Sequence, residues 1–131
     1  MRTISVGGFF HDLNFTYYDS EKKLIASAEE ERFSRKKMHS IMGETVSSVN
    51  ALDWMSREYD FSFHSVDVLV FSDAVEQPIY PFLKKKFPNA SQVKIGHHDA
   101  HLNNIIALNY PLRTTNKNIP AFCFDAFGDN S

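Results

Sequence analysis

The sequence contains a single cysteine, Cys123, and no hydrophobic run long enough to cross a membrane. One cysteine excludes an internal disulfide framework and is typical of a reducing compartment. The absence of a long apolar run argues against a secretory signal and against a transmembrane helix. A net charge of -2 gives no general reason to expect nucleic acid or an anionic membrane as a partner. We therefore expect a cytoplasmic protein.

The sequence also lacks repeats, low-complexity stretches and a linker that would mark a second domain. Its 131 residues are enough for one compact core of modest size. We expect a single unit spanning residues 1–131. The 12 phenylalanines are a heavy load for such a unit, and their rings need cover from the chain or from a partner segment.

The hydrophobic pattern predicts an antiparallel meander followed by alternating helices and strands. The predicted strands span Thr3–Gly8, Asn14–Asp19, Lys23–Glu30, Val66–Phe71, Gln92–Gly96 and Ile119–Phe124. Phe15 and Tyr17 fall on one face of the second strand and Tyr18 on the other, and the fourth strand is expected to be buried on both faces. The predicted helices span Met42–Tyr59, Pro78–Phe87 and Ala100–Tyr110, and a polar basic loop runs from Arg32 to Ser40.

This order of elements predicts an α/β fold with a mixed, ribonuclease H-like sheet flanked by helices on both faces. The same unit forms one half of the actin and hexokinase fold. The chain stops in the turn Gly128–Ser131, directly after its last predicted strand. We therefore expect a truncated domain.

The histidine-rich segment after the fifth predicted strand is the sharpest chemical signal. If a helix begins near His98, then His97 and His101 lie on one face with β-carbons about 5–6 Å apart, and they could share a metal ion. Loops beyond the carboxyl ends of strands are where open α/β sheets bind ligands. The alternative is a surface histidine cluster without a metal. His98 points elsewhere and suits a substrate contact.

Asp125 closes the last predicted strand and is a candidate third ligand. Two histidines and one carboxylate suit iron(II), zinc or manganese. This site requires strands 92–96 and 119–124 to lie side by side. The alternative is that Asp125 caps a turn, which is the commoner role of a lone aspartate.

Two further segments carry candidate site residues. His11 could act as a general base on a hydroxyl, oriented by Asp12, although His11-Asp12 is also an ordinary hairpin turn. The segment Glu29–His39 switches from acidic to basic within a few residues. Its basic half could bind phosphate or a carbamoyl donor, and the alternative is a solvated loop.

Four segments together resemble the amino-terminal part of the O-carbamoyltransferases of antibiotic and nodulation-factor biosynthesis. They are His11-Asp12, Glu29-Glu30-Glu31-Arg32-Phe33-Ser34-Arg35 with Lys37, His97-His98-x-Ala100-His101, and Asp125-x-x-Gly128. The resemblance implies transfer of a carbamoyl group from carbamoyl phosphate, through an ATP-derived carbamoyl-adenylate, to a hydroxyl of a small natural product. The transferring domain of the family is similar to the enzyme that places threonylcarbamoyl on transfer RNA adenosine.

The resemblance also implies roles for individual residues. Iron is held by His97 and His101 with Asp125, His11 is the base, and Lys37 contacts the carbamoyl donor, with Lys36 as a register alternative. Further substrate contacts are assigned to Asp12, Arg35 and His98, and nucleotide contacts to Gly128 and Asp129. The sequence departs from the family pattern at Phe10 and Ala126, where glycine is usual, and at Asp129, where glutamate is usual.

The second half of the family's active site has no counterpart in these 131 residues. The chain alone is therefore predicted to be inactive, because a cleft enzyme with one wall has no enclosed site. The expected partners are the rest of the enzyme, a small-molecule acceptor and a second copy bound through an exposed apolar face. The alternatives are an actin- or hexokinase-like ATPase, a threonylcarbamoyl-type relative, and a non-catalytic module that binds a protein.

Overall fold

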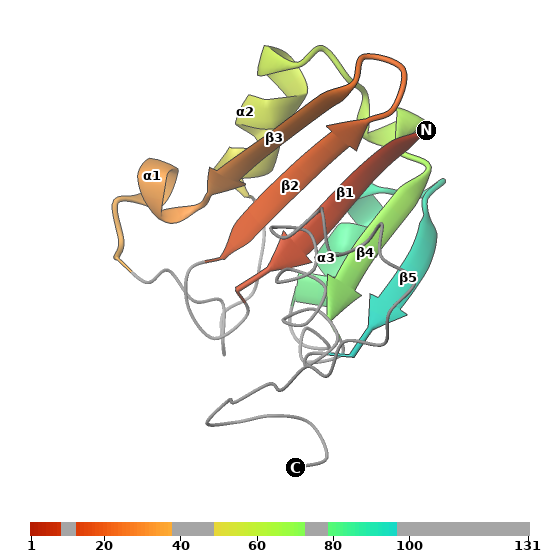
Figure 1. Cartoon of the computed structure of the whole chain (residues 1–131). Helices are drawn as coiled ribbons and strands as arrows, with labels where there is room; N and C mark the ends of the chain where they lie inside the picture. The colour runs from red at the N-terminus through yellow and green to blue at the C-terminus, as the bar shows by residue number, and fades with distance from the viewer. Residues whose placement is uncertain (9–12, 38–48, 73–78, 97–131) are drawn as a thin grey trace, which may run out of the picture.

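A computed structural model of the chain describes residues 1–8, 13–37, 49–72 and 79–96. This part of the chain is an α/β unit built on a five-stranded mixed sheet with the strand order β3-β2-β1-β4-β5 (Figure 1). The strands are β1 (Arg2–Gly7), β2 (Asn14–Asp19), β3 (Leu24–Glu29), β4 (Val68–Ser72) and β5 (Ser91–Ile95). The helices are α1 (Glu31–Ser34), α2 (Asn50–Glu58) and α3 (Ile79–Lys86), with a 3-10 turn at Phe63–Ser65.

The predicted meander is confirmed. β1 pairs antiparallel with β2 from Arg2↔Asp19 to Gly7↔Asn14, and β2 pairs antiparallel with β3. β4 then pairs in parallel with β1, and β5 pairs in parallel with β4. Four strands therefore run in one direction and only β2 runs against them. This sheet is compatible with a ribonuclease H-like fold.

One face of the sheet carries the core. Phe15 and Tyr17 of β2 are fully buried, whereas Tyr18 is exposed, as the alternation predicts. Tyr17 stacks on Phe61, with ring centroids 4.2 Å apart, in the segment that follows α2. On the same side, Tyr80 of α3 packs against Phe71 of β4. Helices α2 and α3 therefore both cover this face. Each large apolar side chain that is fully buried there contributes about 1.5–3 kcal/mol to the stability of the fold.

The opposite face carries the side chains of Tyr18, Ile25 and Val93, which are all exposed. The predicted helix Ala100–Tyr110 and strand Ile119–Phe124 lie outside the described residues. The prediction of helices on both faces is thus confirmed for one face only. No helix in the described part of the chain is long and apolar enough to cross a membrane.

The predicted helix Met42–Tyr59 begins later than its apolar spacing indicated. Val49 is extended, with φ -135° and ψ 109°, and α2 starts at Asn50. Val49 is buried, so its apolar side chain belongs to the core while its backbone lies outside the helix. Residues 42–48 of this prediction lie outside the described residues.

Two other boundaries also differ from the predictions. Glu31–Ser34 form a helical turn where the basic loop Arg32–Ser40 was predicted. The fourth strand starts at Val68 instead of Val66, because the 3-10 turn Phe63–Ser65 is closed by the N–H of Val66, which donates to the Phe63 carbonyl. This strand is also not buried on both faces as predicted: Leu69 and Phe71 are buried, but Val68 and Val70 are only partly buried.

Candidate functional site at the carboxyl edge of the sheet

The four strands that share a direction end at one edge of the sheet (Figure 1). Gly7 ends β1, Glu29 ends β3, Ser72 ends β4 and Ile95 ends β5. In open α/β sheets, ligands bind outside the carboxyl ends of the strands. Three of the sequence motifs start within four residues of these strand ends, and the described fold brings the strand ends themselves to a common edge.

Two glycines, Gly7 and Gly8, stand where the chain leaves β1. A β-carbon added to Gly7 would lie 2.9 Å from Oδ1 of Asn14, the residue that pairs with Gly7 across the strands. Gly8 has a φ of 74°, which L-amino acids with side chains rarely adopt. A side chain at position 7 would therefore displace the amide of Asn14, and position 8 is where the backbone favours glycine. His11 and Asp12 follow this turn and lie outside the described residues.

The acidic half of the charge switch is not a uniform solvated loop. Glu30 is only 3% exposed, and its carboxylate points at the start of α2. Oε1 accepts hydrogen bonds from the backbone N–H of Asn50 (3.2 Å) and from its Nδ2 (2.9 Å), and Oε2 accepts one from the N–H of Ala51 (2.8 Å). The helix cap Val49 has no side-chain acceptor of its own. Glu30, which directly follows β3, thus supplies the cap that α2 lacks.

The backbone of Glu30 joins two more segments. Its N–H donates to the carbonyl of Leu13, which follows His11-Asp12 in the sequence. Its carbonyl accepts from the N–H groups of Phe33 (3.0 Å) and Ser34 (2.9 Å), which starts α1. One buried residue therefore holds together the chain before β2, helix α1 and helix α2. The side chain of Glu30 points inward because it continues the alternation of β3, in which Ala26 and Ala28 are also buried.

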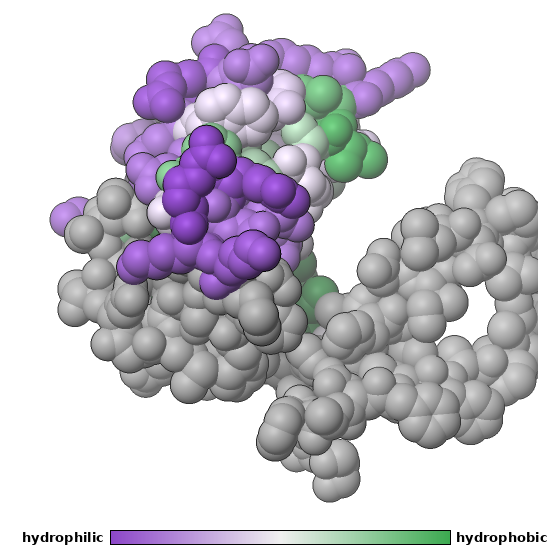
Figure 2. Space-filling view, turned by 90° about the vertical axis from the view of Figure 1, so that its left-hand side faces the viewer, coloured by the Kyte–Doolittle hydropathy of each residue, from purple (hydrophilic) through white to green (hydrophobic). Residues whose placement is uncertain are grey.

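Arg35 and Lys37 are the predicted site residues that the structure describes. Arg35 ends α1 in the left-handed conformation, with φ 61°, and its N–H donates to the carbonyl of Glu31. Both side chains are exposed and follow the carboxyl end of β3. The structure therefore places two cations next to the common strand edge. Figure 2, which views the molecule from the β3 side, shows a mainly hydrophilic surface in the described part of this face.

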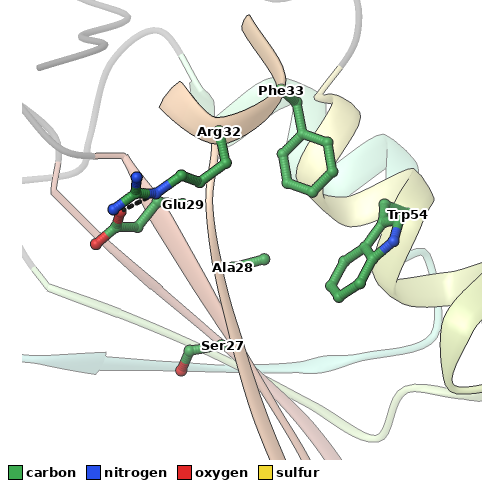
Figure 3. A pocket seen from close by; sticks show the side chains of 6 residues that line it. All are labelled: Ser27, Ala28, Glu29, Arg32, Phe33 and Trp54. Atoms are coloured by element: carbon green, nitrogen blue, oxygen red, sulfur yellow. Dashed lines mark hydrogen bonds and ion pairs between the residues drawn. The ribbon is translucent and has the colours of Figure 1, made fainter. Parts of the chain in front are cut away.

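A shallow hollow of about 360 Å³ lies between β3, α1 and α2 (Figure 3). Phe33 and Trp54 line it on the core side of β3, and the ion pair between Arg32 and Glu29, with Nε 3.2 Å from Oε2, lies on the other side of that strand. The methyl group of Ala28 points to the same side as the two aromatic rings. Sequence analysis missed this site, because Trp54 and Phe33 are far apart in the sequence.

A second buried carboxylate lies at the far end of β2. Asp19 is fully buried and accepts hydrogen bonds from the Tyr17 hydroxyl (3.1 Å), from Nε of Arg2 (3.3 Å) and from the N–H groups of Glu21 and Lys22. Burial acts to raise the pKa of Asp19, but these hydrogen bonds outweigh it and lower the pKa to about 2. Burial, together with the hydrogen bond to Asp19, raises the pKa of Tyr17 to about 12. This cluster closes the β2–β3 hairpin.

The other predicted site residues lie outside the described residues. They are His11, Asp12, His97, His98, His101, Asp125, Gly128 and Asp129. Within residues 1–8, 13–37, 49–72 and 79–96, no three histidine, cysteine, aspartate or glutamate side chains gather so that they could hold a metal ion. The predicted metal centre, the base and the nucleotide contacts therefore stay predictions.

The chain has no significant match among known protein family models, curated proteins or solved structures.

Proposed function

We propose that the chain is the amino-terminal part of an O-carbamoyltransferase, with a ribonuclease H-like sheet that forms half of an actin- and hexokinase-like fold. The observation that carries this proposal is the common edge at which β1, β3 and β5 end. Gly8 and Gly96 lie at two of these ends and each precedes one of the motifs that resemble the family, and Glu29 at the third end begins another. A single reaction centre requires such convergence.

In the proposed transfer, residues of this chain act as base, orient the base and bind the donor. His11 accepts the proton of the acceptor hydroxyl, because an imidazole titrates near neutrality, and Asp12 orients the ring. The hydroxyl oxygen attacks the carbamoyl carbon of carbamoyl-adenylate, and the adenylate leaves with the bonding electron pair. Arg35 and Lys37 offset the phosphate charge of the donor. His98 contacts the substrate, and Gly128 and Asp129 contact the nucleotide.

The proposal includes a divalent ion held by His97, His101 and Asp125, with iron(II) favoured over zinc and manganese. When bound, such an ion polarises the carbamoyl oxygen and offsets negative charge. The acceptor is a hydroxyl of a small natural product, and the remaining half of the site comes from the rest of the enzyme.

Donor binding tests the proposal directly. We expect a non-hydrolysable analogue of carbamoyl-adenylate, the donor of the transfer step, to bind the 131-residue chain in isothermal titration calorimetry. Lys37→Ala should weaken binding about fivefold, because one charge-assisted contact of about 1 kcal/mol is lost. Lys85→Ala is the matched control, since it removes an equally exposed cation from α3 and should leave the affinity unchanged. Absence of binding to the unaltered chain would overturn the proposal.

Metal content separates the proposed enzyme from the non-catalytic alternatives. Purified chain should contain stoichiometric iron or zinc by mass spectrometry, and the metal should be lost in His97→Ala and in His101→Ala. Purified chain that contains no metal would overturn the proposed metal centre. Turnover of carbamoyl phosphate with ATP by this chain alone would contradict the prediction that it is inactive without its second half.

A second candidate function is favoured by the open face of the sheet. Ile25 is 70% exposed, Val93 43% and Tyr18 37%, and all three lie on the face opposite the core. Tyr18 and Ile25 lie directly opposite each other on β2 and β3, and neighbouring exposed apolar side chains are typical of a surface that contacts another protein. A non-catalytic protein-binding module is therefore the alternative, and it predicts a metal-free chain.

A further inference from the structure

Strand β3 forms one edge of the sheet, and among the described residues no strand pairs with its outer side (Figure 1). The N–H of Glu30 donates to the carbonyl of Leu13, so the backbone of Glu30 faces β2. Successive residues of an antiparallel strand direct their backbone groups to alternate sides. The N–H and carbonyl groups that face outward therefore belong to Ile25, Ser27 and Glu29.

The middle of β3 lacks the features that keep edge strands from pairing with other chains. Lysine or proline within an edge strand hinders such pairing. The other edge of the described sheet, β5, contains Lys94. β3 contains neither a charge nor a proline from Leu24 to Ala28, and Ile25 is 70% exposed. Of the two edges, β3 is therefore the one that is open to an added strand.

The two ends of β3 differ in charge. Lys23, which precedes the strand, is exposed. At the other end, Nε of Arg32 lies 3.2 Å from Glu29 and 3.9 Å from Glu31, so two carboxylates share one guanidinium and one negative charge remains. The cations of Arg35–Lys37 come after α1, beyond the strand. A second copy of β3 that runs antiparallel to the first would bring the basic end of each strand to the acidic end of the other.

We propose that β3 pairs with β3 of a second copy of the chain, antiparallel and about a two-fold axis beside Ala26, so that the two sheets become one. In this register Lys23 lies opposite Glu29 of the second copy, and Ile25 lies opposite Ser27 of the second copy. The outward backbone groups of Ile25 and Ser27 then form hydrogen bonds across the interface. This pairing does not depend on the proposed transfer reaction, and each can fail without the other.

The same register places apolar side chains in contact on both faces of the paired strands. On the core side, the small side chains of the two Ala26 residues meet and let the strands approach. Leu24 of the second copy lies opposite Ala28, beside the hollow that Trp54 lines on the core side of β3 (Figure 3). On the open face, the two Ile25 side chains are diagonal neighbours. Pairing therefore removes exposed apolar surface from water.

Proline at position 27 tests the pairing. Because the N–H of Ser27 faces outward, Ser27→Pro leaves the hydrogen bonds between β2 and β3 in place but removes a donor from the proposed interface. Sedimentation velocity of the 131-residue chain over a concentration series gives the dissociation constant of the dimer. We expect Ser27→Pro to raise this constant at least about tenfold, since each copy loses one hydrogen bond.

Ser27→Ala is the matched control for the proline variant. It also removes the hydroxyl of Ser27, which lies 2.7 Å from that of Thr16, but it keeps the backbone N–H. We expect it to leave the dissociation constant of the dimer unchanged. Equal constants for Ser27→Pro and Ser27→Ala, or an unaltered chain that stays monomeric, would overturn the proposal.

A charge exchange tests the register, and it stays decisive if proline disturbs the strand. Lys23→Glu places a carboxylate opposite Glu29 of the second copy, and Glu29→Lys places two cations opposite each other. At low salt each variant should raise the dissociation constant about fivefold. The double variant restores opposite charges and should return the constant to that of the unaltered chain. Circular dichroism checks that each variant is folded. A double variant that dissociates more readily than either single variant would overturn the proposed pairing.

Discussion

At the scale of single residues, two buried carboxylates with different tasks stand out. Asp19 collects four donors at the turned end of the β2–β3 hairpin, whereas Glu30 reaches from β3 to the first turn of α2. Both follow the rule that a buried charge must be hydrogen-bonded. Asp19 has the more visible signal in the sequence, because an aspartate followed by Ser20-Glu21 is typical of a turn whose N–H groups bond to its side chain.

Asp19 predicts how stability depends on pH. Its pKa is lowered from 3.8 to about 2 in the folded protein, so its contribution is fully present above about pH 4. That contribution is lost as the pH falls from about 4 through 2, because the folded state then gives up its hydrogen-bonded carboxylate. Urea unfolding between pH 2 and 6 should show that Asp19→Asn is much less stable than the unaltered chain at pH 6, and that this gap narrows towards pH 2.

Asp60→Asn is the control for this prediction. Asp60 is exposed and has a φ of 50°, a conformation that asparagine also tolerates. Its substitution should leave the pH profile close to that of the unaltered chain. A stability gap for Asp19→Asn that stays constant across the pH range would show that the carboxylate does not titrate in the expected window.

At the scale of elements, the short helix α1 is defined by its surroundings. Four residues are too few to form a stable helix alone. The carbonyl of Glu30 starts this turn, and the left-handed Arg35 ends it. This explains why sequence patterns predicted a loop: neither contact is a property of Glu31–Ser34 themselves. The same turn positions Phe33 against Trp54 of α2.

Replacing the side chain of Glu30 should loosen the first turn of α2. Glu30→Ala leaves the N–H of Asn50 and the buried N–H of Ala51 without their acceptor, which should lower the free energy of unfolding by about 2 kcal/mol. Glu58→Ala is the control, since Glu58 is exposed on α2, and it should change stability by less than about 0.5 kcal/mol. Chemical denaturation followed by circular dichroism gives both values. Equal stability of the two variants would refute the role of Glu30 as the cap of α2.

At the scale of the whole molecule, the described helices lie on one side of the sheet. The core face is filled by α2, α3 and the aromatic residues around Phe61, while Ile25 and Val93 remain exposed on the other face. The heavy phenylalanine content is consistent with this asymmetry, since Phe15, Phe61, Phe71 and Phe87 all lie in one core.

The exposed face predicts self-association. Sedimentation velocity of the chain should show a dimer that forms with increasing concentration, because covering Ile25, which is 70% exposed, removes apolar surface from water. Ile25→Lys should shift this equilibrium towards the monomer. Lys84→Glu, a charge change on the exposed side of α3, should not. A chain that stays monomeric at all concentrations would contradict this prediction.

The sequence by itself determined the meander and the order of the five strands and two longer helices up to β5, because the alternation in β2 reports local burial directly and the apolar run around β4 marks a strand. Only the tertiary structure decided where α2 begins, that Glu31–Ser34 form a helical turn, and that Phe33 and Trp54 share a hollow. The physical reason is the same in each case. The cap on α2 comes from Glu30, 20 residues earlier, and such long-range contacts leave no periodic trace in the local pattern of hydrophobic residues.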